Sequence, residues 1–217
     1  MPQRIDEMSM NKKDKNKVES NIKIDVKIKA EQIYNSFIDF VDGIRVLFLI
    51  HRNKEGGETN NTKTRKVITT NREEFFNELL KLVDEKERSE IPYRIYSSVN
   101  SRNINKAIRQ FKYEQLDADY YGTEQLHNFY LDLKNRWIGC LMQPKQKAES
   151  FFLFDVDDVD GKDMCGETLK VLHGQHIIKQ YKTKNGWHII TKPFNHTEIK
   201  LPEGVELKTD ALLLLDY

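Results

Sequence analysis

Residues 151–158, with the sequence FFLFDVDD, place two carboxylates at alternate positions near the end of an apolar run. Such a run predicts a buried β-strand, and successive side chains of a strand point to opposite faces of its sheet. Asp155 and Asp157 therefore share one face, about 6.5–7 Å apart along the strand. Burying two carboxylates side by side without a counter-charge raises their pKa values, so a divalent cation is the natural compensation. A strand that simply runs into an exposed acidic loop is the alternative interpretation.

Composition excludes several classes of protein. The 217 residues carry 35 Lys and Arg against 34 Asp and Glu, and the net charge of +1 gives no overall field that attracts nucleic acid. Two cysteines, Cys140 and Cys165, are too few for a disulfide scaffold or a Cys-rich zinc module, so a reducing cytoplasm is expected. The longest apolar runs are strand-sized and residues 1–15 lack an apolar signal region, which predicts neither a membrane-spanning nor a secreted protein.

Hydrophobic periodicity predicts a mixed α/β chain. Residues 1–21 are polar and lysine-rich, which predicts a flexible tail. Alternating or dense apolar patterns predict strands in residues 22–30, 43–52, 66–70, 91–99, 151–157, 176–183, 187–194 and 211–217. Helical spacing predicts helices in residues 75–88, 101–116, 123–143 and 164–174. Thr70 and Glu73 have the spacing of a capping box ahead of the first of these helices.

The domain organisation follows from these segments. We expect residues 22–148 to form an N-terminal module of helices and strands, which includes a β-hairpin with a long exposed loop. We expect residues 149–217 to form a compact sheet with one helix on its face. The two modules together would make one α+β core, and the chain is compatible with a catalytic fragment of a longer protein.

A second polar segment lies in residues 180–194. Asn185 and Gly186 predict a tight turn or a close approach of two backbones. Lys184 and His188 supply hydrogen-bond donors close to this turn, which fits a phosphate ligand. For His188 alone, a half-buried strand histidine bonded to a backbone carbonyl is the plain alternative.

Taken together, three apolar strands carry polar motifs, namely Asp155 with Asp157, Gly186-Trp187-His188, and Asp216. In order and strand context, the series resembles the three motifs of the archaeo-eukaryotic primase superfamily, which includes primase-polymerases of phages, plasmids and archaea. The likeness covers roughly residues 93–217. Within it, the segment IYSSVNSRN, with Tyr96, Asn100 and Arg102, is similar to a phrase that precedes the first motif in phage and plasmid members.

The resemblance implies a DNA primase or primase-polymerase with its active site on a sheet like that of an RNA-recognition motif. Its reaction would be template-directed transfer of a nucleoside monophosphate from an NTP or dNTP to a 3′-hydroxyl, which starts DNA synthesis on single-stranded DNA. Two Mg²⁺ or Mn²⁺ ions would be held by three carboxylates, those of Asp155, Asp157 and Asp216. The phosphates of the incoming nucleotide would be bound by Thr183, Lys184, Gly186 and His188.

A template strand would need a separate cationic path with surfaces for base stacking. We expect this path on one face of the helix predicted in residues 101–116, at Arg102, Lys106, Arg109 and Tyr113, and a merely solvated face is the alternative. The partners implied by the family are single-stranded DNA, nucleoside triphosphates and a replicative helicase domain or protein. The implied location is the cytoplasm of an archaeal or bacterial cell, including one that hosts a phage, plasmid or other mobile element.

Two other functions fit parts of the pattern. Residues 152–161 also resemble the first motif of haloacid dehalogenase-type phosphatases, in which Asp155 would be the nucleophile and Asp157 the acid or base. Those enzymes need a lysine and an acidic pair well downstream, whereas only 60 residues follow Asp157 here. The other alternative is a non-catalytic nucleic-acid-binding module of the primase fold.

Overall fold

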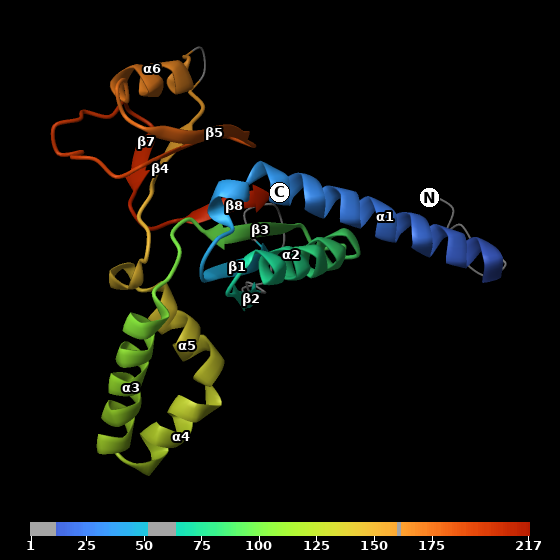
Figure 1. The fold of residues 1–217 in the computed structure, drawn as a ribbon, viewed down its shortest axis with the longest axis vertical. Coiled ribbons are helices and arrows are strands. Elements are labelled where there is room, and N and C mark those ends of the chain that lie inside the picture. Colours follow the sequence, from blue (N-terminus) through green and yellow to red (C-terminus); the bar gives the residue numbers. More distant parts are fainter. Residues whose placement is uncertain (1–11, 52–63, 160–161) are drawn as a thin grey trace, which may run out of the picture.

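The computed structural model describes residues 12–51, 64–159 and 162–217, which form two four-stranded antiparallel sheets with helices around them (Figure 1). The first sheet has the order β2-β1-β3-β8, formed by β1 Arg45–His51, β2 Thr64–Thr69, β3 Tyr93–Ser98 and β8 Leu212–Asp216. The second has the order β5-β6-β4-β7, formed by β4 Phe152–Asp157, β5 Ile177–Thr183, β6 Gly186–Thr191 and β7 Val205–Lys208. The predicted α+β class is confirmed.

The α-helices are α1 Lys12–Ser36, α2 Arg72–Glu87, α3 Ile104–Tyr120, α4 Thr123–Leu131, α5 Leu133–Met142 and α6 Met164–Val171. Two short 3₁₀ helices, η2 Ile38–Phe40 and η4 Pro144–Gln146, follow α1 and α5. In the part of the chain that the structure describes, no helix combines the length and the apolarity needed to cross a membrane.

The first sheet buries one face against α1 and α2. Its contribution to this core comes from three strands, through Leu47, Leu49, Ile95, Leu213 and Leu215. Helix α2 begins where the sequence predicts a cap, but one residue later: the Asn71 side chain accepts a hydrogen bond from the Glu74 amide at 2.9 Å. The Glu74 carboxylate in turn accepts from the Thr70 amide at 2.8 Å, so the two ends of the turn stabilise each other.

The strand predicted in residues 22–30 is wrong, because this segment belongs to α1. Alternation of isoleucine and valine with charged residues suggested a period of two. The residues that reach the core are instead Val26, Ala30 and Ile33, at helical spacing, while Ile24 and Ile28 stay exposed. Residues 12–21 of the predicted tail also lie in α1, and residues 1–11 lie outside the described part.

The second sheet has a small core of its own, on the face that points away from the first sheet. Phe152, Phe154 and Val156 of β4 point away from the first sheet and pack with Met164 and Cys165 of α6. Strands β4, β5 and β6 were predicted from the sequence, with a tight turn or a close backbone approach at Asn185 and Gly186. Strand β7, which pairs with β4 along its other edge, was not, because VELK has no clear apolar alternation.

Strand β8 joins the first sheet instead of the second. It pairs antiparallel with β3, so the expectation that residues 149–217 form a sheet of their own is wrong for this last strand. The consequence is structural: the chain returns from the second sheet to complete the first, and the two sheets share core residues through Phe151, Leu153 and Ile190.

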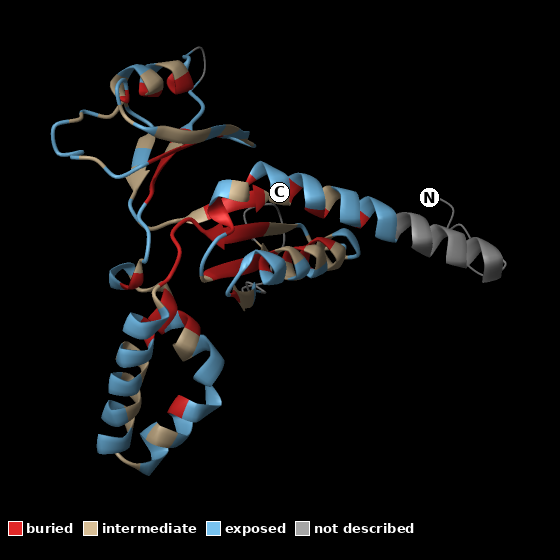
Figure 2. Ribbon diagram, viewed as in Figure 1, coloured by how far each residue is buried: buried red, intermediate tan, exposed pale blue. Residues whose placement is uncertain are grey.

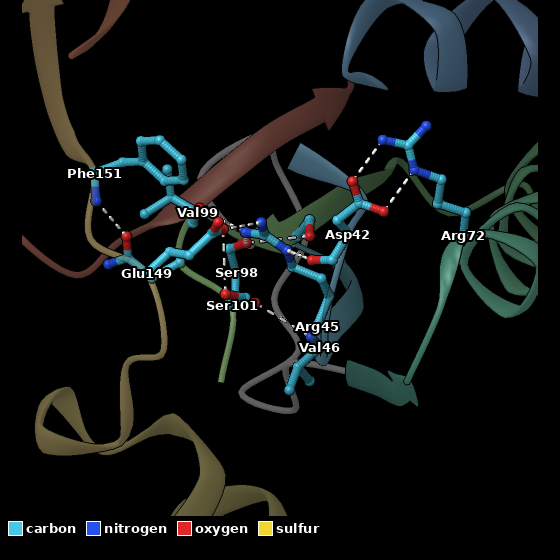
Figure 3. A network of polar contacts seen from close by, with 11 residues as sticks. Asp42, Arg45, Val46, Arg72, Ser98, Val99, Ser101, Glu149 and Phe151 are labelled. Carbon is cyan, nitrogen blue, oxygen red and sulfur yellow. Dashed lines mark hydrogen bonds and ion pairs between the residues drawn. The ribbon is translucent and has the colours of Figure 1, made fainter. Parts of the chain in front are cut away.

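A buried arginine stands where several chain segments cross (Figure 3). The Arg45 guanidinium is fully buried and donates to the carbonyl oxygens of Asp42, Ser98 and Val99, with its Nη2 3.5 Å from the Glu149 carboxylate. Burial lowers the pKa of Arg45 to about 10, although Glu149 opposes this effect. The charge is held by backbone dipoles, which fixes the entry to β1 against the end of β3.

Helices α3, α4 and α5 form a lobe that projects from the two sheets (Figure 1). The helix predicted in residues 123–143 is two helices, broken at Asp132. The lobe has a small aromatic core, in which the Phe111 ring meets those of Phe129 and Trp137. Much of its surface is exposed, in contrast to the buried strands of the first sheet (Figure 2).

Candidate functional site

A cleft of about 300 Å³ lies between the two sheets. The first sheet contributes its apolar side, through Ile50, Tyr96, Leu212 and Leu214. The second sheet contributes its polar side, through Asp155, Asp157, Thr183, Lys184, Asn185, His188 and Lys208. The cleft therefore has one apolar wall and one charged wall, a combination typical of ligand sites.

The carboxylates and the imidazole reach the cleft because of strand register. Asp155 pairs with His188 and Asp157 pairs with Gly186 across the β4-β6 ladder. Asp155 and Asp157 alternate with Phe154 and Val156, which are buried on the far face of the sheet. The structure thus places both carboxylates on one face, as the sequence alternation predicts, and brings them together with His188.

Gly186 allows this close arrangement. A Cβ atom at this position would lie 1.9 Å from the carbonyl oxygen of Val156, and its backbone φ is +156°. No other residue fits so close to β4 without moving the backbone. The turn that begins β6 is thereby pressed against the end of β4, where the Asp158 amide donates to the Asn185 carbonyl at 2.9 Å. Lys184 and Thr183 consequently lie beside the carboxylates.

A hydrogen-bonded chain runs from the wall of the cleft to the first sheet. His188 Nε2 lies 3.2 Å from Asp155 Oδ1, and His188 Nδ1 lies 2.7 Å from the Tyr181 hydroxyl. That hydroxyl donates to the carbonyl oxygen of Leu214 at 3.0 Å, so it accepts from Nδ1. Burial raises the pKa of Tyr181, which therefore stays a neutral phenol.

Lys208 of β7 completes the charged wall. Its Nζ lies 2.6 Å from Asp155 Oδ2 and 3.1 Å from Glu206 Oε2. Burial lowers the pKa of Lys208, but its bonds to Asp155 and Glu206 outweigh this and raise it. The hydrogen bond from His188, followed by that from Lys208, holds the pKa of Asp155 well below its usual range although burial opposes them. Asp155 is therefore an ionised carboxylate that accepts hydrogen bonds from His188 and Lys208.

Asp216 does not join the other two carboxylates. Its Oδ2 lies 2.5 Å from Lys86 Nζ and 3.0 Å from Lys29 Nζ, on the side of the sheet covered by α1 and α2. The cause is a bulge in the β3-β8 ladder, where Tyr96 pairs with Leu214 but Ile95 pairs with Asp216. Without the extra residue, Asp216 would share the face of Leu214, which lines the cleft. The predicted convergence of three carboxylates is corrected accordingly.

Arg102 does not lie on the exposed face of α3, where the sequence interpretation placed it. It is 2% exposed and makes two hydrogen bonds to the Asp210 carboxylate, at 2.8 and 3.0 Å, before α3 begins. Asn100 supports the same carboxylate at 3.1 Å. Arg102 thus ties β3 to the segment before β8 and is not available to a template. Lys106, Arg109 and Tyr113 are exposed on α3, as predicted.

Two residues of the site were missed. Tyr181 could have been found, because a two-residue turn at Lys184-Asn185 pairs residue 181 with His188. Lys208 carried no such signal, since its strand was not recognised. Among the described residues, the structure contains no group of three or more His, Cys, Asp or Glu side chains arranged to hold a metal ion.

Comparison with known proteins adds no relative. No family model, curated protein or solved structure matches this chain. The case for a functional site therefore rests on the geometry of the cleft and on the residues that line it.

Proposed function

We propose that the cleft binds a nucleoside triphosphate with a divalent cation and transfers its nucleotide to a 3′-hydroxyl on a single-stranded DNA template. The observation that carries this proposal is the meeting of Asp155, Asp157 and His188 in one cleft, beside Lys184 and Lys208. Carboxylates suit a hard cation, and the nearby cationic and hydroxyl donors suit phosphates. Primase-polymerase activity is the function that uses both sets of groups.

The carboxylate pair fits a cation that is shared with a ligand. Mg²⁺ in proteins is commonly bound by one or two carboxylates and completed by substrate phosphates and water. Asp155 and Asp157 would supply those carboxylates, and the ion would polarise the phosphoryl group and neutralise the leaving pyrophosphate. The donor set fits one such ion. A second ion of the kind implied by the family lacks its carboxylate, because Asp216 faces α1 and α2.

The triphosphate would be held by the hydrogen-bond donors of the cleft. Lys184 and Thr183 lie at the β5-β6 turn, and His188 presents Nε2–H from the middle of β6. Tyr181 fixes the orientation of the imidazole from behind. The apolar wall, which includes Tyr96 and Leu214, offers a surface for the base or the sugar.

Strand order supports an RNA-recognition-like sheet. The chain order β4, α6, β5, β6, β7 and the sheet order β5-β6-β4-β7 match a split β-α-β arrangement of four antiparallel strands. The second helix of that arrangement is replaced by residues 192–204, which form no helix. In this arrangement the central strands β4 and β6 carry the polar residues, which is where the proposed site lies.

The decisive experiment is nucleotide incorporation with labelled nucleotides, Mn²⁺ and single-stranded DNA, with and without a primer. Asp155→Asn and Asp157→Asn should each abolish incorporation and leave DNA binding largely unchanged. Asp158→Asn is the matched control, because Asp158 is exposed and does not line the cleft. Unchanged incorporation in the Asp155 variant would refute the assignment. Phosphate release from small phosphate esters without a template would favour the phosphatase alternative.

A further inference from the structure

Helix α3 carries an exposed stripe that none of the described elements covers. Tyr113, Leu116 and Tyr120 follow each other at spacings of three and four residues and are 69%, 64% and 84% exposed. Tyr113 and Tyr120 point away from the face of α3 that packs in the lobe, where Ala107 is buried and Phe111 meets the other rings, and Leu116 lies at the edge of that face. Large side chains at this spacing lie on one face of a helix, which is the arrangement by which helices contact each other.

The charges beside this stripe are divided by position. Lys106, Arg109 and Lys112 lie in the first part of α3, and Asp117 and Asp119 lie in its last turn. The first turn contains no acidic residue and the last turn no basic residue. This order opposes the helix dipole, which favours acidic residues at the start and basic residues at the end. Stability of the isolated helix therefore does not explain it.

Contacts within the chain do not explain the charge order either. Across the described residues, the structure gives none of these five side chains an ion pair. Arg109 and Asp117 are two turns apart on the same helix, too far to bond each other. Each lies four residues from Tyr113, on opposite sides of it. Arg109 and Asp117 are thus placed symmetrically about Tyr113, with opposite signs.

We propose that α3 pairs antiparallel with α3 of a second copy of this chain, with the two-fold axis near Tyr113. In that arrangement Arg109 faces the partner's Asp117, Tyr113 faces the partner's Tyr113, and Tyr120 faces the partner's Lys106, so the basic part of each helix lies against the later, acidic part of the other. An isologous interface requires this self-complementarity. The same pairing sets the two helix dipoles antiparallel, so the charge order that is unfavourable in one helix becomes favourable in two.

The expected dimer is weak. Stable interfaces bury about 800 Å² on each partner, and a pair of helices of about 25 Å offers less. The measurement is therefore sedimentation velocity of the full chain over a wide range of concentrations at low salt. We expect reversible dimerisation that weakens as salt is added, because most of the specificity is carried by exposed charges.

Charge exchange gives the sharp test. Arg109→Asp and Asp117→Arg should each reduce dimerisation at least tenfold, because each sets like charges opposite one another twice. The double variant, R109D with D117R, should restore dimerisation. Neither single change removes a buried contact, because both side chains are exposed, so α3 should stay folded. Lys134→Asp, an exposed charge in the same lobe but off the stripe, is the control and should leave dimerisation unchanged.

Three outcomes would overturn the inference. They are a monomer at all concentrations, single variants that dimerise like the original chain, and a double variant that is no better than either single one. If the chain is monomeric and Arg109→Asp weakens binding of single-stranded DNA in a salt-dependent way, the stripe is a nucleic-acid path instead. The proposal does not depend on nucleotide transfer in the cleft, so either can fail without the other.

Discussion

His188 and Asp155 face each other across the β4-β6 ladder, with Nε2 of one 3.2 Å from Oδ1 of the other. The imidazole is held from behind by Tyr181. The contact stabilises the ionised form of Asp155 and lowers its pKa below the ordinary value of 3.8. The folded protein therefore gains stability from this carboxylate above pH 3.8, and loses it as the pH falls through the lowered folded pKa.

This loss of stability at low pH gives the first prediction. Unfolding by urea, followed from neutral pH to below pH 3.8, should show that Asp155→Asn costs stability at neutral pH and costs less as the pH falls. The reason is that acid protonates Asp155 and removes the same charge as the substitution. Asp158→Asn, at an exposed position, should show the same dependence of the free energy of unfolding on pH as the original chain. A constant gap between Asp155→Asn and the original chain at all pH values would contradict the inferred role of the pair.

Lys208 competes with any cation for Asp155. Its Nζ lies 2.6 Å from Oδ2, and the pair is about one third exposed. Exposed ion pairs contribute roughly 0.2–1 kcal/mol, so Lys208→Met should tighten Mn²⁺ binding by up to about fivefold. Titration of the Mn²⁺ electron paramagnetic resonance signal measures this directly. Lys200→Met, on an exposed loop, should leave the affinity unchanged, and weaker binding in the Lys208 variant would show that the lysine supports the site instead.

Gly186 should tolerate no side chain. Gly186→Ala sets a Cβ against the Val156 carbonyl, so we expect a loss of roughly 2–4 kcal/mol in the free energy of unfolding, or a shift of the whole turn. Gly139→Ala is the control, since no atom lies within 4 Å of the added Cβ and alanine favours the helix by about 0.5–1 kcal/mol. Thermal or urea unfolding measures both. Equal stability of the two variants would mean that β6 can move away from β4.

Much of the fold and part of the site could be predicted from local pattern. The apolar run of β4 was enough to place Asp155 and Asp157 on one face, because strand alternation is a local rule. The pairing of β4 with β6, which brings His188 to Asp155, is not local and was expected only from the family resemblance. The position of Asp216 was predicted wrongly because β8 contains one extra residue at a bulge, which no local sequence pattern indicates. The first part of α1 was mistaken for a strand because its alternation fits period two, and only the core selects the helical positions.

Arg102 shows that the burial of a side chain could not be predicted from the local pattern either. A basic residue at the start of a helical pattern was interpreted as part of an exposed stripe, yet its partner Asp210 lies more than one hundred residues away. Removing the guanidinium would leave a carboxylate that is 9% exposed without its counter-charge. We expect Arg102→Ala to cost about 3–5 kcal/mol in the free energy of unfolding. Arg109→Ala, at an exposed position of the same predicted stripe, should cost at most about 0.5 kcal/mol.

Substitution of Asp216 tests whether its carboxylate belongs to an ion pair or to the metal site. Burial lowers the pKa of Lys29, but its bonds to Glu87 and Asp216 raise it above its usual value, and Lys86 is paired with the same carboxylate. Asp216→Asn should therefore lower the free energy of unfolding by roughly 1–3 kcal/mol, and should show coupling to Lys86→Met in a double-mutant cycle. Mn²⁺ affinity should stay unchanged, because the carboxylate points away from the cleft. A large loss of Mn²⁺ affinity without coupling to Lys86 would instead mean that the end of β8 straightens its bulge and turns Asp216 toward Asp155 and Asp157.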